Sequence, residues 1–284
     1  MSCGERRRDD RTRSESLRGT CAVETLTGDL RDLGVGARDL LMVHASLRAV
    51  GPVGGGADGV IDALEAAVGP GGTLFMTLGA RDDWAWVNER PERERPDLLR
   101  QAEPFDCLAT PADPDVGVLA EVFRNRPATK VSDHPEGRFG ASGPLADRLL
   151  ENVPWDDYYG PGSPLERFVQ AGGRALRLGA GLDTLTLLHY AEYMAPVPEK
   201  RRVRRHRVVT GPQGPELRIV NCLDDSNGIV DRPGEDYFAV ILRQYLATGR
   251  ALRGVAGRAG SELIEAADVV AFGVGWMAEH LVDV

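Results

Sequence analysis

Residues 39–78 read DLLMVHASLRAVGPVGGGADGVIDALEAAVGPGGTLFMTL, and this stretch decides the fold. Asp39 to His44 is a short apolar run that predicts a buried strand. Asp58 to Val68 repeats apolar residues three and four apart, which predicts an amphipathic helix that ends in the glycine-rich turn at Gly69. Thr73 to Leu78 predicts a second strand. Two strands joined by such a helix form a right-handed unit with parallel strands, so we expect an α/β fold.

The flanking sequence extends this unit into a central twisted mixed sheet flanked by helices. Arg174 to Leu178 predicts another strand, and Gly211-Pro212-Gln213-Gly214 between two β-rich runs predicts a hairpin. Residues 81–110 form a polar insertion that is too long for a plain connector, which predicts a lid or substrate loop. Further helices are predicted at residues 24–33, 116–124, 145–152, 165–171, 237–246 and 261–267, with a strand at 269–273. We expect one domain over residues 23–284, with a lid-like insertion and a smaller hairpin-containing part.

The composition predicts a soluble globular protein with an acidic body. Of the 284 residues, 42% are hydrophobic and 27% are charged, and no apolar window is long enough to span a bilayer. Residues 1–22 carry six arginines and four acids without an apolar core, which predicts a disordered tail rather than a secretory signal. The remainder carries 28 basic and 39 acidic residues. This balance disfavours nucleic acid and membranes as partners and favours cations.

The cysteines indicate a reducing compartment. Cys3, Cys21, Cys107 and Cys222 lack the paired spacing of a zinc site or a disulfide framework. Neither a zinc-protease motif nor a calcium-loop pattern occurs. We therefore expect a cytoplasmic protein that holds no metal.

One histidine lies where proton transfer is often found in α/β proteins. The strand that ends at Leu178 is followed by the tight turn 179–181, and Asp183 or Thr184 would then cap a helix. His189 would lie in the second turn of this helix, with Glu192 three residues on and on the same face. This position suits a general base, although a lone histidine on an apolar helix is more often a core residue.

Three other polar segments admit a functional and a structural interpretation. Ser46 and Arg48 follow the first predicted strand, where a hydroxyl, a guanidinium and backbone N–H groups could hold a pyrophosphate. The segment lacks the ending of a P-loop, so a structural loop explains it equally well. Ser132-Asp133-His134-Pro135 and the pair Asp224-Asp225 are compatible with turns, and the acids are also compatible with a cation subsite.

Seven short motifs follow one another between about residues 24 and 282. They are His44-x-Ser46 with Arg48 and Gly51, Gly69-Pro70-Gly71-Gly72-Thr73-Leu74, Ser132-x-His134-Pro135, Gly160-Pro161-x-Ser163-Pro164, Thr186-x-x-His189-x-Ala191-Glu192, Asp225-Ser226-Asn227-Gly228 and Asp268-Val269-Val270-x-Phe272-Gly273. In this order the sequence resembles the aminoglycoside 3-N-acetyltransferases of the antibiotic acetyltransferase type. Seven motifs in register are far more specific than a single match.

The resemblance implies an α/β fold distinct from the GNAT acetyltransferases. It implies antibiotic resistance through transfer of acetyl from acetyl-CoA to the 3-amino group of 2-deoxystreptamine aminoglycosides. By position it implies catalytic roles for His189 and Asp225, cofactor binding by Ser46, Leu47, Arg48, Ala49, Val50, Ser132, His134 and Thr186, and substrate binding by Asp82, Asp83, Glu192, Asp224 and Asp225. We expect the enzyme to act as a monomer or homodimer.

In the implied mechanism, His189 removes a proton from the amine, and a carboxylate on the other ring nitrogen fixes its tautomer. Asp224 or Asp225 could supply this carboxylate. We favour Asp225, although Leu223 stands where relatives often place an acid. We expect direct transfer, without an acetyl group on Cys222. The alternatives are an acetyltransferase for another amine and a non-catalytic acidic protein that binds cationic drugs. The range of aminoglycosides and the role of residues 1–22 stay open.

Overall fold

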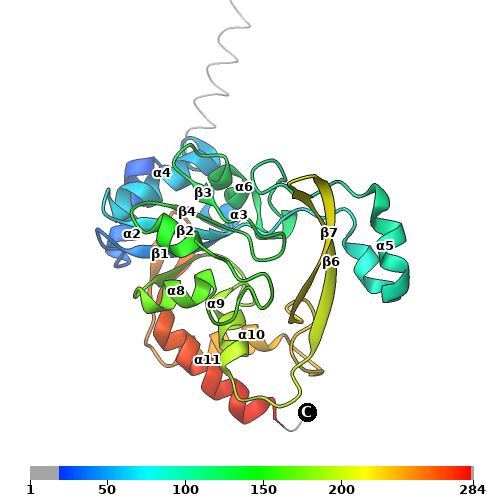
Figure 1. Cartoon of the computed structure of the whole chain (residues 1–284). Coiled ribbons are helices and arrows are strands. Elements are labelled where there is room, and N and C mark those ends of the chain that lie inside the picture. Colours follow the sequence, from blue (N-terminus) through cyan, green and yellow to red (C-terminus); the bar gives the residue numbers. More distant parts are fainter. Residues whose placement is uncertain (1–18, 283–284) are drawn as a thin grey trace, which may run out of the picture.

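The computed structural model describes residues 19–282, in which helices cover both faces of a mixed sheet (Figure 1). Residues 1–18 of the predicted disordered tail lie outside the described residues. Cys21, near the end of that predicted tail, donates its backbone N–H to the carbonyl of Pro52 at 2.8 Å and forms a bridge with Val53.

Residues 19–282 contain a seven-stranded sheet in the order β3-β4-β2-β1-β5-β9-β8. Its strands are β1 (Leu40–Ala45), β2 (Thr73–Thr77), β3 (Lys130–Val131), β4 (Phe139–Ser142), β5 (Arg174–Leu178), β8 (Leu252–Ala256) and β9 (Ala259–Glu265). β1 pairs in parallel with both β2 and β5, whereas the outer strands pair antiparallel. The predicted β-α-β unit and the mixed sheet are confirmed. The carboxyl ends of β2, β1 and β5 meet at one edge, which is where α/β proteins bind ligands.

Two sets of helices enclose the sheet and bury separate apolar clusters against its faces. The helices are α2 (Val23–Asp32), α3 (Leu47–Val50), α4 (Gly56–Val68), α5 (Arg95–Leu98), α6 (Val118–Arg124), α7 (Ala146–Leu150), α8 (Pro164–Gln170), α9 (Leu187–Met194), α10 (Tyr237–Ala247) and α11 (Ala266–His280). α2, α4 and α6 cover one face, and α7 to α11 cover the other. Within residues 19–282 no helix is both long and apolar enough to cross a membrane.

The predicted hairpin forms a second, two-stranded sheet of β6 (Arg202–Gly211) and β7 (Gly214–Leu223). Figure 1 shows it as a long arm at one side of the molecule, beside α5. The polar insertion 81–110 folds into short helical turns, including α5, and contacts β6. Asn88 accepts the N–H of His206 at 2.7 Å, and Phe105 forms a bridge with Val209.

Two predictions for the C-terminal region are wrong. Residues 261–267, predicted as a helix, lie mainly in β9, and residues 269–273, predicted as a strand, lie inside α11. Long-range pairing decides the first case, since β9 lies along β5 and Glu262 accepts a 2.7 Å hydrogen bond from Arg177. In the second case a short apolar run fits a buried helix as well as a strand. α11 buries Val269 in the core against α9.

Candidate active site

His189 lies near the edge formed by the carboxyl ends of the parallel strands. α9 begins at Leu187, so His189 is in its first turn rather than the second, and Thr186 is the N-cap, without a side-chain capping bond. The hydroxyls of Thr186 and Thr77, the last residue of β2, are 3.1 Å apart. This contact brings the start of α9 to the end of a parallel strand, and His189 with it.

Glu192 binds the imidazole of His189. Oε2 of Glu192 lies 2.8 Å from Nδ1 of His189, and the Glu192 side chain is only 1% exposed. The hydroxyl of Tyr237 donates to the other oxygen of this carboxylate and accepts the N–H of Ile229 at 3.2 Å. Because a carboxylate accepts hydrogen bonds, the proton on the neutral ring belongs on Nδ1, which leaves Nε2 as the basic nitrogen.

Two opposing effects set the basicity of His189. Burial lowers its pKa, but the hydrogen bond and the charge of Glu192 outweigh burial and raise the pKa above the ordinary histidine value. Tyr159 stacks on the ring with centroids 5.1 Å apart, and Phe238 meets it edge-on at 4.8 Å. These contacts and the buried carboxylate fix the orientation of the ring, as a general base requires.

The prediction that Asp225 orients His189 is wrong. The carboxylate of Asp225 accepts the hydroxyl of Tyr158 at 2.6 Å and is bonded to Arg205. Glu192 takes the place of Asp225 because residues three apart on one helix are already neighbours. The charge of Asp225 still contributes to the raised pKa of His189, so it acts electrostatically on the ring.

Glu192 and Asp224 do not have the side-chain freedom that substrate binding requires. Glu192 is engaged by His189 and Tyr237, as described above. Asp224 is 3% exposed and accepts the N–H groups of Ser226 at 3.2 Å and Asn227 at 3.0 Å, so it holds a turn. The structure therefore does not support the predicted substrate contacts: Glu192 positions His189, and Asp224 holds the turn.

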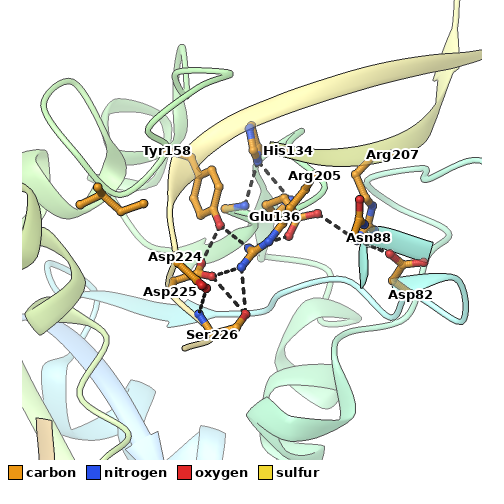
Figure 2. A network of polar contacts seen from close by, with 12 residues as sticks. Asp82, Asn88, His134, Glu136, Tyr158, Arg205, Arg207, Asp224, Asp225 and Ser226 are labelled. Carbon is orange, nitrogen blue, oxygen red and sulfur yellow. Dashed lines mark hydrogen bonds and ion pairs between the residues drawn. The ribbon is translucent and has the colours of Figure 1, made fainter. Parts of the chain in front are cut away.

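Asp225 is the first member of a row of acids and arginines, which we call the acid–arginine ladder (Figure 2). Its members, in spatial order, are Asp225, Arg205, Glu136, Arg207 and Asp82. Arg205 and Arg207 contact the two oxygens of Glu136 at 3.2 and 3.1 Å, and Arg207 lies 2.8 Å from Asp82. All five side chains are between 9% and 17% exposed, so each is largely buried and keeps a small accessible part.

The predicted substrate residues Asp82 and Asp83 line a cavity of about 350 Å³ between the insertion and β6. Asp83 is exposed and pairs with Arg81 at 2.9 Å. Burial raises the pKa of Asp82, whereas the charge of Arg207 opposes this rise. Trp84 lines the same cavity, which therefore offers acidic and aromatic surface to a ligand.

The predicted cofactor residues 46–50 form the single-turn helix α3 and its N-cap. The hydroxyl of Ser46 accepts the N–H of Ala49 at 3.3 Å. Gly179 has a positive φ of 62°, and a Cβ at this position would lie 2.5 Å from Cβ of Ala49. The turn before α9 can approach α3 so closely only because residue 179 is glycine. This packing brings the segment 46–50 to the same edge of the sheet as α9 and its N-cap Thr186.

Ser132 and His134 are buried, and their polar atoms are bonded to the backbone. Nε2 of His134 lies 2.9 Å from the carbonyl of Trp155, and Nδ1 accepts the N–H of Gly137 at 2.8 Å. The Ser132 hydroxyl accepts the N–H of Phe139 at 2.9 Å. Burial lowers the pKa of His134. These side chains shape their loop, so the structure does not support the predicted direct contacts with a cofactor.

Several residues of the site were not predicted from the sequence. Tyr159 and Phe238, which enclose His189, come from different parts of the chain and carry no shared motif. Glu136 follows the flagged Ser132–Pro135 segment. Arg205 and Arg207 alternate along β6, so a period-of-two pattern places both on one face of the hairpin. This alternation in the sequence could have predicted that the two arginines lie side by side on the hairpin.

A nucleophilic cysteine and a metal centre have little support in the described part of the chain. Burial raises the pKa of the Cys222 thiol to about 12, so the thiolate is scarce at neutral pH. Between residues 19 and 282, no three His, Cys, Asp or Glu side chains are grouped so as to hold a metal ion.

Asp236 caps α10, the helix that carries Tyr237 and Phe238 to His189. Its carboxylate accepts the N–H groups of Phe238 at 2.8 Å and Ala239 at 3.2 Å. We expect Asp236→Ala to lower the free energy of unfolding by about 1 kcal/mol, because one helix cap is lost. Urea denaturation followed by circular dichroism measures this. Asp236→Asn, which keeps an acceptor oxygen, should retain most of the stability, and equal losses in both variants would contradict the capping role.

Comparisons with known proteins show the family and the fold of this chain. The family model described as aminoglycoside 3-N-acetyltransferase matches residues 42–278. The chain is 44% identical to aminoglycoside N(3)-acetyltransferase III of Serratia marcescens, over 91% of this chain and 97% of that protein. It is 40% identical to aminoglycoside N(3)-acetyltransferase VIII of Streptomyces fradiae, over 96% and 97%. The solved structure "AAC-IIIb binary with CoASH" is 38% identical with a TM-score of 0.87, over 93% of this chain and 99% of that chain. The chain belongs to the aminoglycoside 3-N-acetyltransferase family.

Proposed function

We propose that this enzyme transfers the acetyl group of acetyl-CoA to the 3-amino group of a 2-deoxystreptamine aminoglycoside, with His189 as general base. The observation that carries the role of His189 is its 2.8 Å contact with the buried carboxylate of Glu192, which leaves Nε2 basic. The family supports the substrates, since its members are aminoglycoside N(3)-acetyltransferases and one solved relative contains CoASH.

His189 acts twice in the proposed reaction. An aminoglycoside amine is mostly protonated at pH 7, and only its neutral form attacks a thioester. The ammonium therefore loses one proton to solvent before the attack, and Nε2 of His189 takes a second proton from the nitrogen as the N–C bond forms. Glu192 stabilises the resulting imidazolium. When the C–S bond breaks, the imidazolium returns this proton to the leaving thiolate. Acetyl passes directly to the amine, and the products are the amide and CoASH.

Residues 46–50 and Thr186 are the proposed contacts for CoA, because α3 and the start of α9 meet at the carboxyl edge of the parallel strands. Asp82 and Asp83 are the proposed contacts for the drug, since they line the cavity beside β6. We further propose a single catalytic domain over residues 23–284 that works in the cytoplasm as a monomer or homodimer.

A thiol-release assay with acetyl-CoA tests the function. The acceptors are gentamicin, kanamycin, apramycin and an unrelated primary amine. We expect CoASH release with at least one aminoglycoside and no release with the unrelated amine, and NMR of the product should locate the new amide on the 3-amino group. Release with the unrelated amine alone would indicate another acetyltransferase, and drug binding without release would indicate a non-catalytic binding protein.

Direct transfer predicts that Cys222 is dispensable for chemistry. We expect Cys222→Ala to keep kcat within about threefold, because the thiol is buried and its pKa is raised. It should cost about 1 kcal/mol of stability through the lost packing. Mass spectrometry of the wild-type enzyme incubated with acetyl-CoA alone should show no added acetyl group. A stoichiometric acetyl-enzyme would contradict direct transfer.

A further inference from the structure

The three carboxylates of the acid–arginine ladder, Asp225, Glu136 and Asp82, are paired with arginines of the same chain. A site for a polycationic drug gains most from unpaired carboxylates. In the acid–arginine ladder, three carboxylates instead face two guanidinium groups, which leaves one negative charge. Arg205 is the central cation, because it binds both Asp225 and Glu136 and receives further support from the Tyr158 hydroxyl at 2.9 Å.

The ladder runs from the catalytic ring to the cavity. At one end, Tyr158 bonds Asp225 and packs edge-on against Tyr159, which stacks on His189. Asp225 raises the pKa of His189 and Arg205 lowers it, so both charges act on the ring. At the other end, Asp82 and Arg207 line the cavity of about 350 Å³. A substrate that extends from His189 to this cavity would therefore lie next to the residues of the ladder.

We propose that Arg205 is a specificity-determining residue: it occupies an ammonium site beside His189, and the ammonium groups of the acceptor compete with it for Asp225 and Glu136. This inference rests on the proposed function. It follows that the enzyme favours amine-rich acceptors less strongly than its acids alone would allow. A guanidinium in the site repels ammonium groups and admits hydroxyl groups, which accept its hydrogen bonds.

Arg205→Met removes the charge and keeps much of the apolar stem. We expect the KM of an amine-rich acceptor such as gentamicin to fall about five- to tenfold at low salt, as for one close charge pair. The KM of an acceptor with fewer amino groups should fall less. The difference should shrink in high salt, because screening weakens attraction between charges. Calorimetric titration of the same acceptors in the presence of CoASH gives a second readout that does not depend on turnover.

Three further variants separate competition from a purely structural role. Arg205→Met combined with Asp225→Asn removes one charge of each sign and should return the KM ratio of the two acceptors toward the wild-type ratio. Glu136→Gln should shift the ratio in the opposite direction, and it tests the proposal even if Arg205→Met does not fold. Arg202→Met is the matched control. Arg202 lies on the same strand and pairs with Asp157 at 2.6 Å, and its loss should leave the ratio unchanged.

An unchanged KM ratio in both Arg205→Met and Glu136→Gln would overturn the inference while leaving the proposed function intact. An equal rise in KM for every acceptor in Arg205→Met would also overturn it, because that result indicates a structural role. A wild-type enzyme that acetylates no aminoglycoside would overturn the proposed function, and this inference with it.

Discussion

Replacing His189 with alanine lowers kcat for acetyl transfer about 10³-fold, within the range expected for the loss of a general base. The site then lacks the imidazole that takes a proton from the amine nitrogen during attack. The Nε2 atom of His189 is the basic nitrogen of the site, since Nδ1 is bound to Glu192. Steady-state kinetics with acetyl-CoA and the best acceptor of the panel measures the change.

The His189→Ala protein should still fold and still bind acetyl-CoA. The side chain is 20% exposed, so its removal leaves a smaller void than loss of a fully buried ring. Thermal unfolding and calorimetric titration of acetyl-CoA check both points. His280→Ala, on an exposed position at the end of α11, is the matched histidine control and should keep wild-type kcat. Full turnover by His189→Ala would exclude the proton-transfer role.

Glu192→Gln is expected to lower kcat about 10²- to 10³-fold, although glutamine has nearly the same shape. An amide cannot stabilise the imidazolium by charge, and it no longer selects the tautomer with the proton on Nδ1. The buried hydroxyl of Tyr237 also loses its charged acceptor. Glu279→Gln, at an exposed position of α11, is the control and should leave kcat unchanged. Equal activity of Glu192→Gln and wild type would show that the carboxylate does not assist His189.

The pH dependence of kcat/KM distinguishes a role of Glu192 in tuning His189 from a purely structural role. The hydrogen bond and charge of Glu192 raise the pKa of His189 against the effect of burial. Because the neutral ring is the base, kcat/KM of the wild type falls as the pH drops through this raised pKa. Without the carboxylate the pKa falls, so the acid limb of Glu192→Gln should move to lower pH. An unmoved limb would contradict the assignment.

The same shift predicts the sign of a stability change with pH. A pKa that is higher in the folded than in the unfolded state means that protonation of His189 stabilises the fold. This contribution is fully present below the unfolded value of about 6.5 and is lost as the pH rises through the folded value. Urea unfolding at about pH 5 and about pH 9 should show that Glu192→Gln loses more stability at the lower pH.

Local sequence was sufficient wherever neighbours in the chain are also neighbours in space. The apolar spacing of residues 58–68 produces α4, and the flanking runs produce the parallel strands β1 and β2. His189 and Glu192 meet because residues three apart share a helix face. The order of short motifs along the chain indicated the family that the comparisons show.

Features that depend on contacts between residues far apart in the chain could be determined only from the tertiary structure. Residues 259–265 are a strand because β5 offers an edge to pair with, and His134 is structural because Trp155 lies within hydrogen-bond distance of its ring. Asp225 binds Arg205 of the hairpin instead of His189, a choice that no local pattern records. Periodicity and spacing determine which face of an element a side chain occupies, whereas its partner depends on how elements far apart in the chain pack together.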